Sequence, residues 1–265
     1  MLHETRSRIP LPFAALLLLV ASSACAARQE ATAKPEPAAA HWSYSGDTGP
    51  DHWGTLDEAY FAAAKGVAQS PIDIVTGAAI EAQAPALVFT AASVPLTIVN
   101  NGHTIEVDCA AGNSVQFGSQ TYALKQFHFH SPSEHTLDGR NAALEMHMVH
   151  KMADGHAAVV GVLIQEGATN AAFDAIWQHL PATPGPEVTV PGVTIDPTSL
   201  LPADRGYYFY DGSLTTPPCT EGIRWFVLKT PIQMSSGQIA AFRKAYYGNN
   251  RPVQPHHARI VLRTP

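Results

Sequence analysis

The sequence predicts a mainly β, single-domain protein with a few peripheral helices. From residue 87 onward, apolar segments of strand length follow one another, separated by Pro, Asn-Gly and Gly-Asn turn signals. The chain also has 19 glycines and 21 prolines, which suits many turns between short strands. Hydrophobic residues make up 46% of 265 residues, enough for one large core, and all-β domains often reach this size. No repeat or long linker interrupts the pattern, so we expect one domain over residues 41–265.

The N-terminus has the features of an export signal over residues 1–26. Arg6 and Arg8 give it a basic start, residues 11–20 form an apolar run, and Cys25 lies between two alanines that suit cleavage. The run is too short for a membrane-spanning helix. We therefore expect an exported protein, periplasmic or secreted, with no transmembrane segment in the mature chain. Cleavage just before Cys25, followed by lipidation of this cysteine, is the alternative.

Residues 27–40 are polar and contain proline, which indicates a disordered tether. The net charge is −6 and there is no Lys/Arg run, so nothing indicates nucleic acid or an anionic membrane as a partner. A homodimer is left open. Export would place Cys109 and Cys219 in an oxidising compartment, where they form one disulfide or remain separate thiols.

The secondary structure follows from local pattern. Residues 157–165 are an almost continuous apolar run, which indicates a central strand. Apolar residues recur at helical spacing in residues 170–180, and Pro181 ends that helix. Helices are predicted over residues 56–64, 170–180 and 235–246. Strands are predicted over residues 87–90, 96–100, 104–108, 115–124, 126–130, 142–150, 157–165, 207–210, 223–228 and 257–262.

Two of the predicted strands carry histidines in alternation with apolar residues. Side chains alternate faces along a strand, so His128 and His130 share one face with Gln126. In the second strand Glu145 and His147 share a face in the same way. An isolated pair of histidines is more often a surface or core feature than a metal site, but here a third histidine and two polar neighbours accompany it.

Three imidazoles with a fourth position open are the layout of a catalytic zinc site, whereas a structural site is closed by a fourth side chain. A metal-bound histidine usually passes its other ring proton to an amide, carbonyl or carboxylate that orients the ring. Gln126 and Glu145 each lie two residues before a proposed ligand and suit that role. The pattern therefore predicts zinc at His128, His130 and His147.

From about Trp42 to Leu262 the chain resembles the α-class carbonic anhydrases, particularly the exported bacterial ones. The stretches that carry the resemblance occur in the order of the family: Gln69-Ser-Pro-Ile-Asp-Ile74, Asn100-Asn-Gly-His103, Gln126-Phe-His-Phe-His130, Ser133-Glu-His135, Glu145-Met-His-Met-Val-His150, Leu214-Thr-Thr-Pro-Pro218 and Trp225-Phe-Val-Leu228. The resemblance implies one domain around a large, twisted, mostly antiparallel sheet. It also implies zinc at the three histidines and reversible hydration of carbon dioxide to bicarbonate and a proton.

The resemblance further implies how the residues work. Zinc lowers the pKa of its bound water to about 7, the value known for carbonic anhydrase itself, so that hydroxide attacks carbon dioxide at neutral pH. Thr215 would donate its single hydroxyl proton to Glu134 and accept one from the hydroxide. His103 matches the proton-shuttle position. The substrate pocket matches Val149, Val159, Leu214, Thr216, Ile223 and Trp225.

Other histidines and the cysteines are also interpreted through the resemblance. His135 and His150 match interior histidines of the family and are not expected to bind metal. Surface positions are expected for His41, His52, His156, His179, His256 and His257. Exported relatives commonly have a cysteine just before the Gln-Ser-Pro-Ile segment, paired with the one at Cys219, and this chain has none there. We therefore predict a Cys109–Cys219 disulfide instead.

Two other functions compete with carbon dioxide hydration. One is a different zinc hydrolase with three histidines, but nothing in the sequence forms a groove for a peptide or sugar. The other is a non-catalytic zinc-binding or adhesion module on the same fold. Such modules typically lose one or more of the ligands, whereas His128, His130, His147, Glu134 and Thr215 are all present.

Overall fold

The computed structural model describes residues 40–265. The predicted export signal and residues 27–39 of the predicted tether lie outside the described residues. Residue 40 already belongs to the folded part, because the Tyr60 hydroxyl donates a hydrogen bond of 3.0 Å to the Ala40 carbonyl. No helix among the described residues is both long and apolar enough to cross a membrane.

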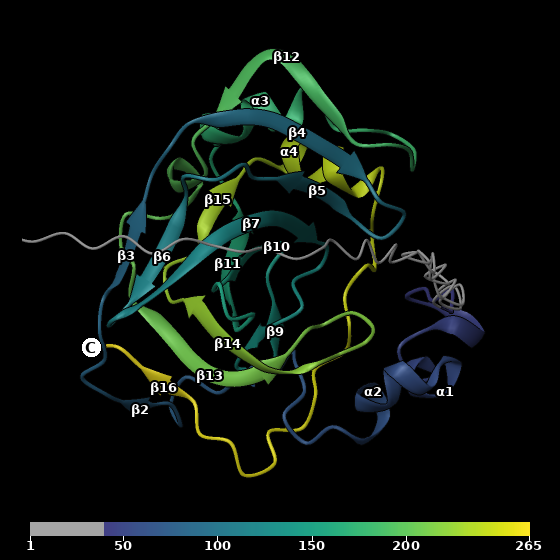
Figure 1. The fold of residues 1–265 in the computed structure, drawn as a ribbon, viewed down its shortest axis with the longest axis vertical. Helices are drawn as coiled ribbons and strands as arrows, with labels where there is room; N and C mark the ends of the chain where they lie inside the picture. The colour runs from purple at the N-terminus through teal and green to yellow at the C-terminus, as the bar shows by residue number, and fades with distance from the viewer. Residues whose placement is uncertain (1–39) are drawn as a thin grey trace, which may run out of the picture. The chain divides into compact units, whose positions relative to one another are not determined.

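The described chain is mainly β, as the sequence predicts (Figure 1). Its strands are β1 Asp73–Ile74, β2 Ile80–Glu81, β3 Leu87–Thr90, β4 Val94–Asn100, β5 Ile105–Asp108, β6 Ser114–Phe117, β7 Gln120–His130, β8 Thr136–Leu137, β9 Arg140–Asn141, β10 Leu144–Lys151, β11 Ala157–Glu166, β12 Val188–Ile195, β13 Tyr207–Ser213, β14 Glu221–Leu228, β15 Ile232–Met234 and β16 Leu262–Arg263. Its α-helices are α1 Trp53–Leu56, α2 Phe61–Lys65, α3 Asp174–Trp177 and α4 Ser236–Arg243. Short 3₁₀ turns are η1 Gly46–Thr48, η2 Glu58–Tyr60, η3 Ala171–Phe173 and η4 Pro197–Leu200.

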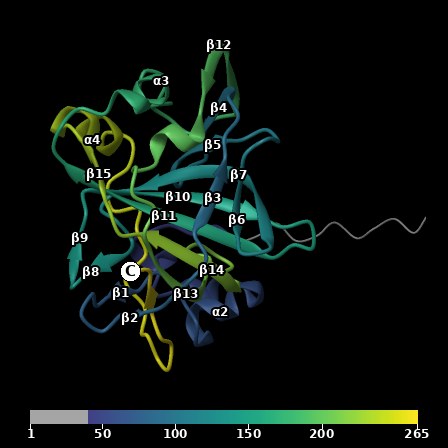
Figure 2. The same cartoon turned by 90° about the vertical axis from the view of Figure 1, so that its left-hand side faces the viewer.

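One sheet of 13 strands organises the structure. Its main path runs β12-β4-β5-β7-β10-β11-β14-β13-β16-β2, and β7, β10 and β11 lie at its centre (Figures 1 and 2). Most neighbours are antiparallel, while β11 pairs in parallel with β14 and β15, and β16 pairs in parallel with β2. The predicted large, mostly antiparallel sheet is therefore confirmed. A separate small sheet has the order β1-β8-β9.

The two faces of the central strands bury different clusters. On one face Phe127 and Phe129 enter the larger apolar core, and the Phe129 ring lies within 6.2 Å, between centroids, of the rings of Phe173, Trp177 and Phe242. These rings come from η3, α3 and α4, so the helices cover this face. A second apolar cluster, which includes Val159 and Trp225, lies apart from it and contains the buried residues around the histidines.

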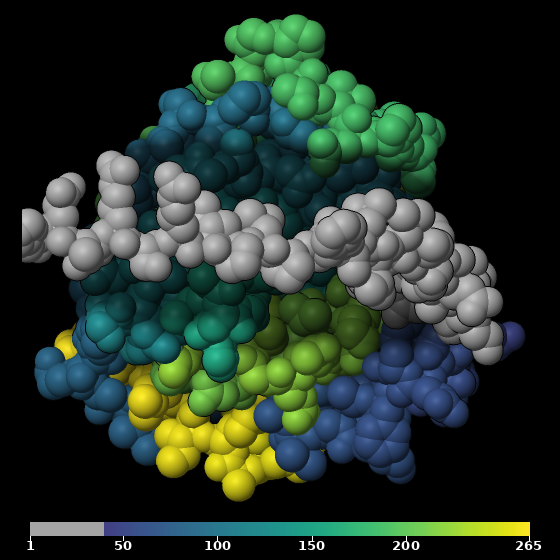
Figure 3. Space-filling model, viewed as in Figure 1, coloured from purple at the N-terminus to yellow at the C-terminus, as the bar shows by residue number. Residues whose placement is uncertain are grey.

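Segments distant in sequence come together on the surface of the described part. Figure 3 shows the green chain around β12 at the top, the yellow C-terminal residues at the bottom and the blue region of α1 and α2 at the lower right. The C-terminal strand β16 pairs with β2, and next to it the Ile80 N–H donates to the Val261 carbonyl at 2.9 Å. The C-terminal strand thus extends the sheet rather than standing free.

Most predicted strands are confirmed, and the exceptions have physical causes. The predicted strand over residues 115–124 is wrong, because Gly118 takes a φ of +60° and turns the chain back between β6 and β7. The helix predicted over residues 56–64 is broken into α1, η2 and α2. The last strand predicted over residues 257–262 is wrong except at Leu262, which begins β16.

The sequence did not predict β12, which contains Pro191 and Gly192. This strand lies at the edge of the sheet, and its pairing with β4 shifts register between Thr189 and Thr194. A proline is tolerated at an edge strand or a bulge because its missing N–H is not needed there. Local composition therefore indicated a loop where tertiary pairing makes a strand.

The predicted disulfide is wrong. Both Cys109 and Cys219 are free thiols. Cys109 follows β5 and packs against the larger apolar core, whereas Cys219 is buried in the loop between β13 and β14. Burial raises the pKa of Cys109 to about 12 and that of Cys219 to about 11, so neither thiol is ionised near neutral pH.

Candidate functional site

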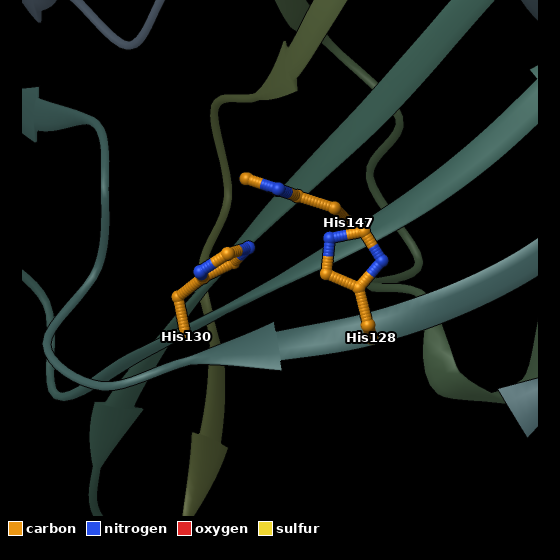
Figure 4. A group of neighbouring side chains, drawn as sticks. All are labelled: His128, His130 and His147. Carbon is orange, nitrogen blue, oxygen red and sulfur yellow. The ribbon is translucent and has the colours of Figure 1, made fainter. Parts of the chain in front are cut away.

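Three histidines converge because of the register between β7 and β10. His147 is paired directly with His128, and Glu145 is paired with His130. One ring nitrogen from each of His128, His130 and His147 lies within 4.8 Å of the others. Figure 4 shows the three rings turned toward one shared space, two from β7 and one from the neighbouring strand. This arrangement could hold a metal ion.

The outer ring nitrogens each face a polar partner. His128 Nδ1 lies 2.7 Å from Gln126 Oε1, and His130 Nδ1 lies 2.7 Å from the Asn249 carbonyl oxygen. Both acceptors require the ring to carry its proton on Nδ1, which leaves Nε2 with a lone pair. His147 has the opposite arrangement: its Nε2 lies 2.9 Å from Glu145 Oε1, although off the line of a hydrogen bond, and its Nδ1 faces the shared space.

All three imidazoles are held neutral. Burial, followed by the neighbouring His130 and His147, lowers the pKa of His128 well below its usual value. Burial likewise lowers the pKa of His130 to about 4, and it lowers the pKa of His147 despite Glu145 nearby. His130 Nε2 is buried and has no hydrogen-bond partner. The unpaired lone pair of His130 Nε2 fits a metal ion, because buried polar atoms without a partner destabilise the folded protein.

A chain of buried polar groups supports the site from behind. Glu145 accepts hydrogen bonds from the backbone N–H groups of Glu134 and His135, at 2.9 and 2.8 Å, and lies 2.7 Å from His135 Nδ1. His135 Nε2 lies 2.7 Å from the Tyr210 hydroxyl, which in turn lies 2.8 Å from Ser70 Oγ. Burial alone would raise the pKa of Glu145, but His135 and His147 hold it well below the usual value. Glu145 is therefore an ionised carboxylate that has three hydrogen-bond partners and lies next to His147.

Glu134 and Thr215 lie next to the three histidines. Glu134 Oε1 accepts the Arg251 backbone N–H at 2.8 Å, and its carboxylate oxygens lie 3.6 Å from His130 Nδ1 and 3.8 Å from His147 Nδ1. Burial raises the pKa of Glu134 to about 7, opposed by His147, by the Arg251 N–H and by the Thr215 hydroxyl. Glu134 Oε2 is buried without an aligned hydrogen bond, although the Thr215 hydroxyl is close enough to lower this pKa.

A cavity of about 450 Å³ opens from the histidines on one side. Its wall includes all six residues of the predicted substrate pocket: Val149, Val159, Leu214, Thr216, Ile223 and Trp225. Trp225 is buried and donates its indole N–H to the Ser213 carbonyl at 2.9 Å, so only its apolar ring faces the site. This wall suits a small ligand without charge.

On the other side of His128 and His130 lies a smaller, polar cavity of about 110 Å³. His103 lines it together with Asn101, Thr104 and Glu106. The His103 ring stacks on Trp42, with centroids 3.7 Å apart and planes 7° from parallel. Burial, followed by His41, lowers the pKa of His103 from its usual value. The structure therefore brings His103 to the same cavity as two of the three histidines.

The remaining histidines mostly lie where they were expected. His135 and His150 are buried, as predicted. The surface prediction is confirmed for the exposed residues His41, His52, His156 and His257. It is wrong for His179 and His256, which are half-buried because their rings contact the carbonyl oxygens of Ala175 and Asp73.

Sequence reasoning missed three residues that shape the site. Asn249 lies 119 positions from His130, yet its side chain donates to the carbonyls of Phe129 and His103, at 3.0 and 3.1 Å. Gly161 is needed behind β10, because a Cβ there would lie 2.9 Å from Glu145 Oε1. Arg251 is buried and contacts Gln69 and Ser70. The only local signal was the turn-like Gly-Asn-Asn-Arg-Pro stretch, which indicates a loop and not its partners.

A model of the eukaryotic-type carbonic anhydrase family matches residues 48–265. A carbonic anhydrase of Klebsiella pneumoniae is 42% identical over 228 residues, covering 84% of this chain and 91% of that protein. Among solved structures, the α-carbonic anhydrase of Thermovibrio ammonificans in complex with sulfanilamide is 44% identical with a TM-score of 0.82, covering 84% of this chain and 99% of that one. A hyperthermostable carbonic anhydrase from a hydrothermal vent chimney is 42% identical with a TM-score of 0.81, covering 85% and 100%.

The fold and the site define an α-class carbonic anhydrase, and the chain belongs to the eukaryotic-type carbonic anhydrase family. The resemblance drawn from its motifs is therefore confirmed. The chain is an enzyme of carbon dioxide hydration rather than a non-catalytic module.

The polar chain behind the site leads to a prediction about stability. Replacing Tyr210 by Phe removes a buried hydroxyl that serves both His135 and Ser70. Leaving a buried polar group unpaired costs about 1–3 kcal/mol, so the free energy of unfolding should fall by that amount in urea titration. Tyr247→Phe is the matched control, because Tyr247 is 73% exposed, and it should leave stability unchanged. Equal stability of the two variants would contradict a role for the Tyr210 hydroxyl.

Proposed function

We propose that this chain hydrates carbon dioxide reversibly to bicarbonate and a proton at a zinc ion held by His128, His130 and His147. The observation that carries the proposal is the convergence of three ring nitrogens within 4.8 Å, with the opposite nitrogens facing Gln126, Asn249 and Glu145. Three neutral nitrogens without a fourth protein ligand suit catalytic zinc. When bound, zinc lowers the pKa of a coordinated water to about 7, as is established for carbonic anhydrases.

Glu134 and Thr215 would orient the attacking oxygen. The Thr215 hydroxyl has one proton, and the neighbouring Glu134 carboxylate can accept it. The Thr215 oxygen is then free only to accept a hydrogen bond from the space between the histidines. The attacking oxygen would thereby turn a lone pair toward the apolar cavity.

The apolar wall would hold the substrate. Carbon dioxide has no charge and no net dipole, so an apolar surface can bind it without paying for desolvation of polar groups. Val149, Val159 and Trp225 present such a surface beside His147. The product carries a charge, so the same wall favours its release.

His103 would accept the proton. If the reacting water has a pKa near 7, direct loss of its proton to bulk water is limited to about 10² s⁻¹, because the return step cannot exceed the diffusional ceiling. A histidine titrates in the required range. His103 lines the polar cavity with His128 and His130, and this cavity has room for bridging water.

Export also remains a proposal, since its signal lies outside the described residues. The basic start, the apolar run and the small residues around Cys25 support a periplasmic or secreted enzyme. Lipidation of Cys25 is the alternative to simple cleavage, and the oligomeric state is left open.

The first test concerns the metal. His147→Ala would leave two imidazoles for an ion that needs three, so the purified variant should lose both zinc and hydration activity while its far-UV circular dichroism stays near that of the parent. Zinc is measured by atomic absorption. His156→Ala is the control, because His156 is exposed and outside the site, and it should retain one zinc. Equimolar zinc with near-parental turnover in His147→Ala would refute the assignment.

The second test concerns the orienting pair. Thr215→Ala and Glu134→Gln should each slow hydration by about 10²-fold and keep zinc bound, because each removes one oriented group at the reacting centre. Thr121→Ala, at an exposed position of β7, should have parental kinetics. Loss of zinc in either variant would point to a structural role, and unchanged rates would exclude the orienting role.

The third test concerns the proton. His103→Ala should lower the maximal hydration rate in dilute buffer to about 10² s⁻¹ while zinc stays bound, and concentrated imidazole should restore the rate. Stopped-flow measurements at several buffer concentrations check this. His52→Ala is the control for an exposed histidine. A His103→Ala variant as fast as the parent in weak buffer would mean that protons leave by another route.

A further inference from the structure

The loop that carries Thr215 is fixed at both ends by one short segment, residues 66–70. This loop joins β13 to β14. At its start, the Ser70 N–H donates to Ser213 Oγ at 2.9 Å, and the Ser213 N–H donates back to Ser70 Oγ at 3.1 Å. Within the loop, the Cys219 N–H donates to the Thr216 carbonyl at 2.8 Å. A displacement at Cys219 is therefore passed on to the residues beside Thr215.

At the far end of the loop, Gln69 and Glu221 make the connection. Gln69 Nε2 donates to the Cys219 carbonyl and to Glu221 Oε1, both at 3.0 Å. Glu221 Oε1 also accepts the Ala68 N–H at 2.7 Å. Glu221 Oε1 thus accepts hydrogen bonds both from the backbone of residues 66–70 and from the Gln69 amide, which in turn donates to the Cys219 carbonyl of the loop. Cys219 is a free thiol, so hydrogen bonds and not a disulfide connect this end of the loop to residues 66–70.

The same amide connects the loop to the other half of the orienting pair. Gln69 Oε1 accepts a hydrogen bond of 2.8 Å from Arg251 Nη1. The backbone N–H of Arg251 donates to Glu134 Oε1 at 2.8 Å. Gln69 therefore lies between the loop of Thr215 and the backbone that holds Glu134, and Glu221 fixes the orientation of its amide.

Gly66 lets the segment approach this close. A Cβ at position 66 would lie 2.4 Å from both Gln69 Nε2 and Glu221 Oε1, and 2.6 Å from the Ala62 carbonyl oxygen. Contacts under about 3 Å force a displacement. The backbone at Gly66 has ordinary angles, with a φ of −62°. Any side chain there would strike this pair of polar groups directly.

We propose that Glu221 is a positioning residue for the reaction: through Gln69 it fixes the loop that holds Thr215 in line with Glu134. The proposal rests on the proposed function, in which Thr215 and Glu134 orient the attacking oxygen. Glu221 itself touches neither substrate nor metal ligands. Its effect on catalysis must therefore pass through the orienting pair, Thr215 and Glu134.

A double-mutant cycle tests this dependence. Glu221→Met should lower kcat/KM for hydration about 10-fold with zinc retained, whereas the same change made in Thr215→Ala should lower it less than 2-fold, because the orientation it protects is already lost. An equal loss in both backgrounds, or no loss in the parent, would overturn the proposal. Glu166→Met, an exposed carboxylate removed far from the loop, should be neutral in both backgrounds.

Gly66→Ala is the second variant, and it leaves both Gln69 and Glu221 in the sequence. Because the added Cβ displaces the Gln69–Glu221 contact, Gly66→Ala should also lower kcat/KM in the parent and have little effect in Thr215→Ala. This variant tests the proposal even where Glu221→Met folds poorly. Amide hydrogen exchange gives a readout independent of activity. Exchange of the Cys219 N–H should be at least 10-fold faster in either variant, and unchanged exchange would overturn the proposal even in an inactive parent. An inactive parent with faster exchange in the variants would instead refute the proposed function and leave the positioning of the loop supported.

Discussion

The register between β7 and β10 is the constraint on which the site depends. Because side chains alternate along a strand, a slip of one residue would send His147 into the apolar core and Met146 or Met148 toward His128. The apolar face prevents the slip. Phe127 and Phe129 are both fully buried, and the Phe129 ring lies among aromatic rings from η3, α3 and α4. Exchanging them for histidines would bury unpaired polar groups. The core on one face therefore fixes the ligands on the other.

Two buried carboxylates, Glu145 and Glu134, lie beside the three neutral imidazoles, and their surroundings differ. Glu145 supplies negative charge behind β10, and its cost of burial is offset by two backbone N–H groups and His135. Gly161 on β11 makes room for this carboxylate. The ionised Glu145 can then stabilise the charge that a bound cation would bring to His147. The adjacent Glu134 has fewer donors: the Arg251 N–H reaches Oε1, whereas Oε2 has no aligned hydrogen bond and, when the carboxyl is ionised, is left able to accept from Thr215.

The sequence predicted the central strands and the histidine pair because both are local patterns of period 2. It could not predict Asn249, whose carbonyl faces His130 from 119 positions away, since that contact arises from tertiary packing alone. The β6–β7 hairpin was missed because its turn is only two residues, Gly118 and Ser119, between two segments of strand composition. Strand β12 was missed because Pro191 and Gly192 resemble a loop. The proposed Cys109–Cys219 pair failed because the two thiols pack against different parts of the structure. The sequence alone therefore predicts the pattern of side chains along one strand, but it does not predict contacts between loops that are distant in the chain.

Both cavities border the histidine face of β7, and in the proposed function each would serve a different part of the reaction. Carbon dioxide is apolar and would enter along Val149, Val159 and Ile223, while the proton is polar and would leave past Thr104 toward His103. Three residues line both cavities, namely Gln126, His128 and Thr216, so the two paths would meet beside the histidines. Water ordered for proton transfer then need not occupy the apolar wall. A site in which one path served both purposes would have to expel water for every substrate molecule that enters.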